Sequence, residues 1–276
     1  MFTWPHPIFL MRDDKYSSQD IKIQVHIPYQ FLIKRFDEIM REGINPEVYF
    51  DEVSLELAGP LDLENIRDEC NRRGLTLTMH GPYSDLNPGS ADEGVRTRTV
   101  DVYGRAFEAA GYLRPRTIVL HAGYSEKRFK GDVELWLSQS LKTWPPFVNA
   151  ARRLDMVIAV EHIFEKTPYP LKALMTAVNS PFFGVCVDSG HLNVYAGDGI
   201  EEWIRELGPF IAEAHIHDNS GLSDDHLPVG DGSIDFPLFF KLLKAHARDP
   251  VFTIEPHGEE MMMRAIPAVK RLLEGL

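Results

Sequence analysis

The sequence has few cysteines, fewer basic than acidic residues, and no long apolar run. Two cysteines in 276 residues, Cys70 and Cys186, cannot build a disulfide framework, so we expect a reducing, cytoplasmic compartment. No run of about 20 apolar residues is present, so neither a membrane span nor a membrane partner is expected. Residues 1–16 carry early prolines and charges instead of the apolar stretch of a signal peptide.

The shortage of basic residues bears on the partners of the protein. Lysine and arginine together number 29 against 41 aspartates and glutamates, which gives a formal charge of −12. Nucleic-acid backbones are bound by lysine and arginine, and no clustered basic loop is present, so no nucleic-acid partner is expected. The sequence also lacks low-complexity segments and Gly/Ser linkers, which predicts a single domain over residues 1–276.

Short β-branched runs alternate with longer amphipathic stretches along the chain. Predicted strands lie at 21–27, within 48–57, and at 75–80, 117–121, 156–161, 183–188, 210–215 and 251–255. Predicted helices lie at 31–41, 62–73, 95–110, 133–154, 169–178, 200–207 and 236–247, with a last helix that ends at 272. Pro145 and Pro146 are expected to bend or break the helix at 133–154.

Eight strand-then-helix units in succession predict an α/β fold, a single (β/α)8 TIM barrel. An open, doubly wound sheet is the alternative. No glycine-rich phosphate loop follows the first predicted strand, which disfavours that alternative.

Side chains that commonly bind metal ions stand at the carboxyl ends of six predicted strands. In chain order they are His80, His121, Glu161, Asp188, His215 and Glu255. All strand ends of a barrel open onto one face, where active sites are built, so these side chains should converge. Histidine, aspartate and glutamate are ligands of Zn²⁺ and Mn²⁺, and crowded carboxylates repel each other unless cations neutralise them. The pattern therefore predicts a metal centre at this rim.

Two loops carry further candidate ligands. His191 comes three residues after Asp188, and the long polar loop after His215 contains Asp224 and His226. A loop of that length with an Asp-x-His pair is more typical of function than of a simple connection. His191, Asp224 and His226 are therefore predicted to join the metal centre.

These motifs resemble those of the xylose isomerase-like TIM barrels, also called the AP endonuclease family 2 group, which contains endonuclease IV and many sugar isomerases and epimerases. The matching motifs follow the family order: His80-Gly-Pro-Tyr83, His121-Ala-Gly, Val160-Glu161, Val187-Asp188-Ser-Gly-His191, His215-Ile-His-Asp218, Asp224-Asp-His226 with Gly230-Asp-Gly232, and Ile254-Glu255-Pro256. The stretch at 80–90, with Asp218-Asn219 and 255–257, also resembles the cobamide-remodelling phosphodiesterase branch.

The resemblance to endonuclease IV implies up to three zinc ions. The first would be held by His80 and His121, with Glu161 bridging it to the second. The second would be completed by Asp188, His215 and Glu255, and the third would be held by His191, Asp224 and His226. Such a centre implies hydrolysis of a small phosphoester, in which a zinc-bound hydroxide attacks phosphorus.

The same resemblance leaves a second activity open. The sugar isomerases and epimerases of the group need one ion, here Zn²⁺ or Mn²⁺, at the equivalents of Glu161, Asp188, His215 and Glu255. The substrate would be a polyhydroxylated sugar or sugar phosphate, and Glu161 and Glu255 would form an acid/base pair working through a metal-stabilised ene-diolate. Hydrolysis is the favoured hypothesis because the Asp-x-His pair and His80 point to three ions. A metal-stabilised binding barrel without catalysis is a third hypothesis.

Four further residues near the strand ends have open or supporting roles. His26 and Tyr29, at the end of the first strand, face either the pocket or the core. Strand alternation predicts that His162 points away from the pocket. His217 is predicted to support a ligand rather than to bind metal itself.

The aromatic residues and one cysteine complete the predictions. Tyr83 is expected to form a wall of the pocket, and His257 to line its mouth. Core packing is predicted for Trp136, Trp144, Trp203 and Cys186.

Overall fold

The structure, a computed structural model, describes residues 23–256 and 258–274, apart from the side chains of 259–263. Eight parallel strands close into a barrel in sequence order, with the first paired to the last. They are β1 (Ile23–Pro28), β2 (Asn45–Tyr49), β3 (Thr78–His80), β4 (Thr117–His121), β5 (Val157–Glu161), β6 (Phe183–Asp188), β7 (Ile211–Ile216) and β8 (Val251–Ile254). The predicted (β/α)8 barrel is confirmed, and the open sheet is excluded.

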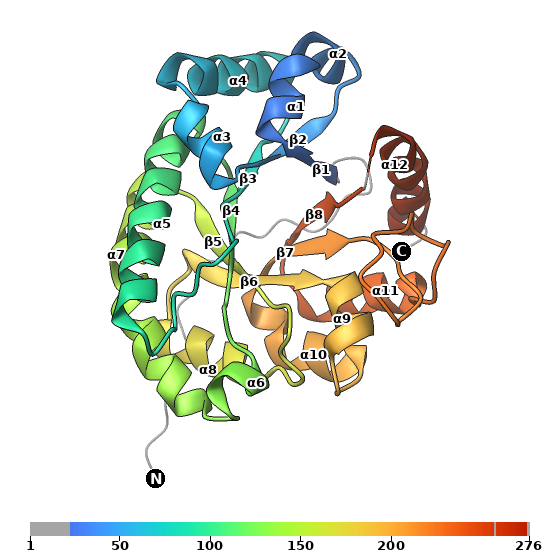
Figure 1. Ribbon diagram of the computed structural model, residues 1–276. Coiled ribbons are helices and arrows are strands. Elements are labelled where there is room, and N and C mark those ends of the chain that lie inside the picture. Colours follow the sequence, from blue (N-terminus) through green and yellow to red (C-terminus); the bar gives the residue numbers. More distant parts are fainter. Residues whose placement is uncertain (1–22, 257, 275–276) are drawn as a thin grey trace.

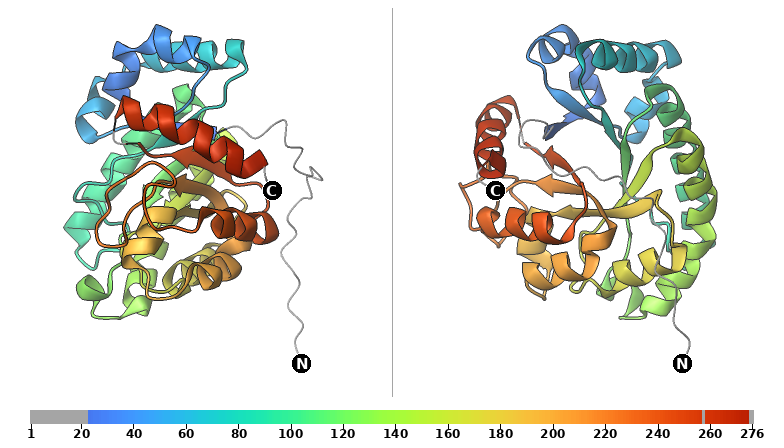
Figure 2. Two further views of the ribbon diagram at one scale, coloured as in Figure 1. Left: turned by 90° about the vertical axis from the view of Figure 1, so that its right-hand side faces the viewer. Right: turned by 180° about the vertical axis from the view of Figure 1, so that it is seen from behind.

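Helices surround the barrel as an outer layer (Figures 1 and 2). They are α1 (Tyr29–Lys34), α2 (Phe36–Arg41), α3 (Glu52–Leu57), α4 (Pro60–Arg73), α5 (Glu93–Leu113), α6 (Glu126–Phe129), α7 (Val133–Leu154), α8 (Tyr169–Val178), α9 (Ser189–Tyr195), α10 (Ile200–Leu207), α11 (Phe236–His246) and α12 (Glu259–Glu274), with a short 3-10 turn at Gly208–Phe210. None of the described helices is long and apolar enough to cross a membrane. The predictions for residues 1–16 and the start of the first strand lie outside the described residues.

Two predicted elements, the strand within 48–57 and the helix at 31–41, are divided differently in the structure. The segment at 48–57 holds only the end of β2, and its second half forms α3. The Asp51 carboxylate accepts the backbone N–H of Ser54 at 2.7 Å, which caps a new helix and ends the extended chain. The predicted helix at 31–41 is divided at Arg35 into α1 and α2.

The helix α7 runs unbroken through Pro145 and Pro146, so a break is excluded and the bend stays a prediction. Both prolines are exposed on the solvent side of the helix. Their rings therefore point away from the core, and the carbonyls four residues earlier, those of Leu141 and Lys142, lose their N–H donors without ending the helix.

The core between helices and barrel contains the tryptophans, as predicted. Trp136, Trp144 and Trp203 are fully buried, and the indole N–H of Trp136 donates to the carbonyl of Ala122 at 3.1 Å. Burying each such side chain contributes on the order of 2–3 kcal/mol. Cys186 lies in a small apolar cluster, where burial raises the pKa of its thiol and keeps it protonated.

Candidate active site

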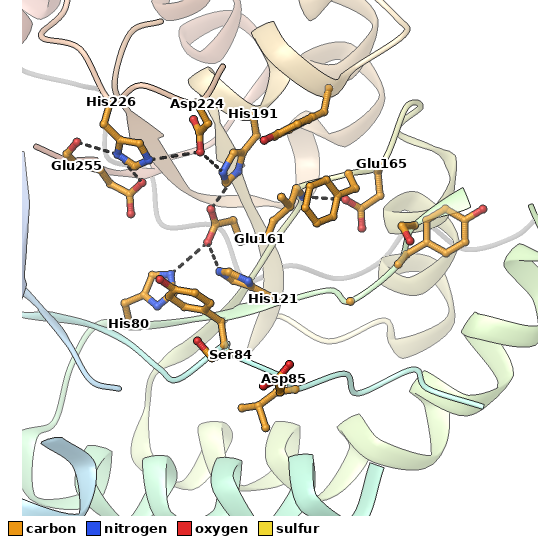
Figure 3. A pocket seen from close by; sticks show the side chains of 18 of the residues that line it. His80, Ser84, Asp85, His121, Glu161, Glu165, His191, Asp224, His226 and Glu255 are labelled. Atoms are coloured by element: carbon orange, nitrogen blue, oxygen red, sulfur yellow. Dashed lines mark hydrogen bonds and ion pairs between the residues drawn. The ribbon is translucent and has the colours of Figure 1, made fainter. Parts of the chain in front are cut away.

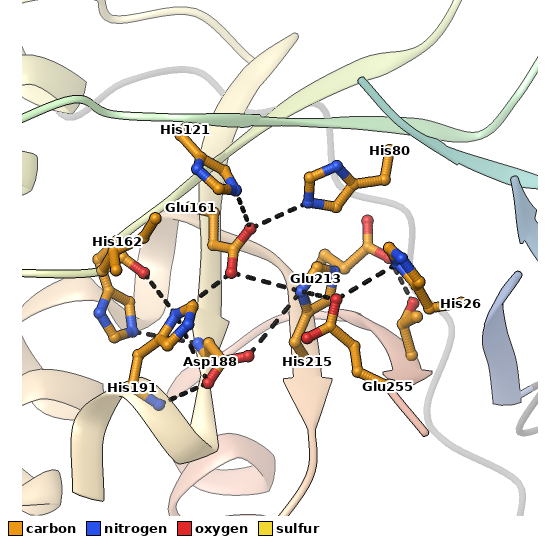
Figure 4. A network of polar contacts seen from close by, with 12 residues as sticks. His26, His80, His121, Glu161, His162, Asp188, His191, Glu213, His215 and Glu255 are labelled. Atoms are coloured by element: carbon orange, nitrogen blue, oxygen red, sulfur yellow. Dashed lines mark hydrogen bonds and ion pairs between the residues drawn. The ribbon is translucent and has the colours of Figure 1, made fainter. Parts of the chain in front are cut away.

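Glu161 is the centre of a polar network at the carboxyl ends of the strands (Figure 4). Its Oε2 lies 3.2 Å from Nε2 of His80 and 3.1 Å from Nε2 of His121, which end β3 and β4. Its Oε1 lies 3.3 Å from Nδ1 of His191 and 3.6 Å from Nδ1 of His215. One carboxylate therefore faces four imidazoles from four segments, the arrangement expected of a bridging ligand.

His215 on β7 joins the second group of predicted ligands. Its Nδ1 lies 3.2 Å from the Glu255 carboxylate and 3.9 Å from that of Asp188. The ring is fully buried, yet neither of its nitrogens forms a hydrogen bond with a described residue. A buried imidazole is rarely left without a partner, so this observation fits a site built for a cation.

Asp224 holds the third group together. Its Oδ2 lies 3.3 Å from Nε2 of His191 and 3.4 Å from Nε2 of His226. His217 also reaches this group, since its ligand atom lies within 4.8 Å of those of Asp224 and His226. All nine predicted ligands thus lie in one connected network, and several sets of three have the spacing of a metal site.

The carboxylate of Asp188 is oriented by the start of α9. Its Oδ1 accepts the backbone N–H of His191 at 2.6 Å as the helix N-cap. Another neighbour is His217, whose Nε2 lies 3.0 Å from Oδ1. Gly190 permits this contact, because a Cβ at Gly190 would lie 1.9 Å from the His217 ring. The supporting role of His217 stays a prediction, because its ligand atom also lies within 4.8 Å of those of Asp188 and His191.

His162 points away from the pocket, as expected. Its Nε2 accepts the backbone N–H of Asp188 at 3.1 Å, and its ring packs against Trp203 with centroids 4.6 Å apart. Burial lowers the pKa of His162 to about 3, so the ring stays neutral and remains an acceptor.

The charges of the network depend on one another. Burial alone would raise the pKa of the Glu161 carboxyl, but the imidazoles of His121 and His215 hold it well below its usual range. Burial alone would lower the pKa of His226, but the Asp224 carboxylate raises it to about 9. The neighbouring carboxylates likewise raise the pKa of His80, His191 and His215, whereas burial lowers that of His121. A divalent cation would replace the protons that the raised pKa values favour.

A cavity of about 760 Å³ opens above the network (Figure 3). Tyr83 lines it and stacks on His121 with ring centroids 4.7 Å apart, which confirms its predicted place in the pocket wall. His26 lines it as well, whereas Tyr29 is buried against Phe50. The prediction for His257 lies outside the described residues.

Glu47 and Glu165 belong to this region although no motif marks them. Glu47, on β2, is fully buried and lies 3.0 Å from Nδ1 of His26 and 3.5 Å from Nε2 of His215. A glutamate inside a buried strand was the available signal. Glu165 lines the cavity, and its Oε2 accepts the backbone N–H of Ile163 at 2.8 Å while its buried Oε1 has no described partner. Burial raises the pKa of Glu165 to about 7.

The loop that carries Asp224 and His226 is anchored by Asp218. The buried Asp218 carboxylate accepts the backbone N–H groups of Gly230, Gly232 and Ile234 at 3.0, 2.9 and 3.2 Å. Its own backbone pairs with Leu227 in an isolated bridge. The Asp-x-His pair is therefore held by a folded loop rather than by an open one.

Comparison with known proteins agrees with this architecture. Residues 47–276 match the family model described as xylose isomerase-like TIM barrel. The chain is 30% identical over 223 residues to the uncharacterised protein MJ1311 of Methanocaldococcus jannaschii, covering 78% of this chain and 76% of that protein. It is 28% identical over 180 residues to L-ribulose-5-phosphate 3-epimerase UlaE of Salmonella heidelberg, covering 62% of this chain and 60% of that protein.

Solved structures show the same similarity. A D-tagatose 3-epimerase-like protein superposes with a TM-score of 0.79 at 25% identity, covering 92% of this chain and 97% of that one. An L-ribulose 3-epimerase superposes with a TM-score of 0.75 at 16% identity, covering 93% and 95%, and shows the shared fold alone. The activities named among these proteins are those of enzymes, in agreement with the prediction that this chain is one.

Proposed function

Because the chain belongs to the xylose isomerase-like TIM-barrel family, we propose that it is a divalent-metal-dependent epimerase or isomerase of a small sugar or sugar phosphate. The observation that carries this proposal is the placement of Glu161 and Glu255. Their carboxylates flank Nδ1 of His215 at 3.6 and 3.2 Å, and both line the cavity. Two carboxylates around one ligand site are what proton transfer on two faces of a substrate requires.

The donor set fits a divalent cation. Glu161, Asp188, His215 and Glu255 would hold it, and nitrogen with carboxylate oxygen suits Zn²⁺ and Mn²⁺ alike. A bound ion would polarise the substrate carbonyl and the adjacent hydroxyl. The two buried nitrogens of His215 support this assignment, because carboxylates surround them at 3.2 to 3.6 Å without forming a hydrogen bond of good geometry.

The two glutamates would then exchange protons with carbon. Glu161 removes the proton from the carbon beside the carbonyl, since its pKa lies well below its usual range and the carboxylate is ionised. The pKa of Glu255 is also lowered, since the imidazoles of His215 and His26 outweigh its burial, so Glu255 would first take up a proton from water. It would give this proton to the opposite face, which inverts that carbon, and Glu161 would release its proton to water. Tyr83 and Glu165 on the wall would bind substrate hydroxyls, and the free Oε1 of Glu165 offers an unused acceptor.

Phosphoester hydrolysis is the second candidate, and a specific observation favours it. His191, Asp224 and His226 form a third ligand group beside Glu161, more than a single-ion epimerase requires. The epimerase relatives and structural neighbours favour the first candidate.

Deuterium incorporation tests the proposal. Protein loaded with Mn²⁺ or Zn²⁺ is incubated in D₂O with ketoses and their phosphates. We expect deuterium beside the carbonyl together with the epimer. Glu161→Gln and Glu255→Gln should lower both by at least about 100-fold, whereas Glu126→Gln, an exposed carboxylate on α6, should change neither. Exchange that survives in Glu161→Gln would contradict the assigned base.

Asp224→Ala separates the two candidates. As an epimerase the variant should lose at most one equivalent of metal and keep deuterium exchange. If the wild type instead cleaves bis(p-nitrophenyl) phosphate, exchanges no ketose proton, and loses cleavage in Asp224→Ala, the hydrolase takes the place of the epimerase.

A further inference from the structure

The lining of the cavity contains a positive side chain besides the ligand network. Five carboxylates of the described residues line the cavity, three of them, Glu161, Asp224 and Glu255, within that network. Among the described residues of the lining, Arg128 is the one lysine or arginine. It stands on α6, in the loop that follows β4, and not among the predicted ligands.

Arg128 has no acidic partner among the described residues, although the chain carries 41 acidic residues. Other exposed arginines do find partners: Arg98 pairs with Glu52 at 2.6 Å, and Arg116 pairs with Asp249 at 2.9 Å. The nearest acid in sequence, Glu126, is paired with Lys166 at 3.3 Å instead. The exposed Arg128 is therefore available to a ligand in the cavity that it lines.

The backbone that carries Arg128 is fixed in place. The Ser125 hydroxyl accepts the backbone N–H of Arg128 at 3.2 Å and caps α6. Ser125 also forms a parallel bridge with Phe164, which joins the loops after β4 and β5. The loop that carries α6 is therefore fixed to the loop after β5, which also supplies Phe164 and Glu165 to the cavity lining.

We infer that the substrate carries a terminal anionic group, a phosphate monoester or a carboxylate, and that Arg128 binds it while the sugar carbonyl lies over the ligand network. This inference rests on the proposed function and names its substrate class. A guanidinium binds either anion through paired N–H donors. A cavity of about 760 Å³ has room for a small phosphorylated sugar in addition to bound ions.

The test compares charged and uncharged substrates in matched variants. Wild type should epimerise L-ribulose 5-phosphate with a higher kcat/KM than L-ribulose. Arg128→Gln should raise KM for the phosphate by about 10- to 100-fold and leave KM for the free sugar unchanged. Lys127→Gln, on the same helix but outside the lining, should change neither value. An Arg128→Gln variant with an unchanged phosphate preference overturns the inference while the proposed function stands.

Two further measurements distinguish a carboxylate from a phosphate and test the subsite without catalysis. A larger effect of Arg128→Gln on D-fructuronate than on the phosphate supports the anion subsite and assigns it to a carboxylate. If no ketose is epimerised, the proposed function fails, and calorimetry then tests the subsite by itself. Weaker binding of L-ribulose 5-phosphate to Arg128→Gln than to wild type supports it, and equal binding overturns it.

Discussion

The Glu47 carboxylate lies 3.5 Å from Nε2 of His215, on the opposite edge of the ring from Glu161 and Glu255. A carboxylate in that place favours the tautomer with the proton on Nε2 and leaves the lone pair of Nδ1 for a metal ion. Carboxylate–histidine–metal arrangements of this kind orient ligands and increase their basicity. Glu47, inside the barrel, would thus orient His215 at the rim and increase its basicity.

Replacing Glu47 should weaken metal binding without removing a ligand. We expect Glu47→Gln to lower the affinity of the Glu161–His215 centre by about 10- to 100-fold, measured by competition with a chromogenic chelator. Glu52→Gln, a partly exposed carboxylate at the start of α3, is the control and should bind metal like the wild type. Equal affinities in both variants would show that Glu47 does not orient His215.

Asp218→Ala should loosen the loop that carries Asp224 and His226. Four backbone N–H groups, those of Gly230, Gly232, Ile234 and the adjacent Asn219, would lose their carboxylate acceptor, so we expect the free energy of unfolding to fall by roughly 2–4 kcal/mol. The variant should also lose the metal equivalent that depends on Asp224. Urea denaturation and metal analysis measure the two effects. The neighbouring Asp225→Ala removes only a contact with Ser223 and serves as the control. Full metal content in Asp218→Ala would show that Asp224 can bind metal without the anchoring of the loop by Asp218.

Glu165 should make stability depend on pH. Burial raises its pKa from 4.5 to about 7, so the folded state keeps a proton that the unfolded state loses above about pH 4.5. Its contribution is fully present below that pH and is lost as pH rises through about 7, by about 3 kcal/mol at most. Chelator-treated Glu165→Gln should therefore lose less stability than wild type between pH 5 and pH 8 in urea denaturation. Exposed Glu201→Gln should follow the wild type, and identical slopes in all three proteins would contradict the assignment.

Strand ends were the most predictable part of this molecule. A β-branched run that stops at a histidine or a carboxylate predicts both the strand and its last side chain, so β4 with His121 and β6 with Asp188 follow from the sequence. Asp51 was harder, because a capping aspartate after an apolar run resembles a continuing strand until its bond to Ser54 is seen. The role of Glu47 could not be predicted, because it depends on His215, which is distant in sequence. Glu165 could not be predicted either, because its burial beside the cavity is set by the fold and not by a motif. The continuity of α7 could not be predicted, because it depends on whether Pro145 and Pro146 face the core or the solvent.

The closed order of the strands also determines when the predicted metal centre can form during synthesis. Of the nine predicted ligands, Glu255 leaves the ribosome last, and only the pairing of β8 with β1 and β7 brings it to His215. A nascent chain therefore holds imidazoles and carboxylates for most of its synthesis without a complete centre. Metal capture should then be selective for finished barrels, and it would stabilise them after closure instead of guiding the growing chain.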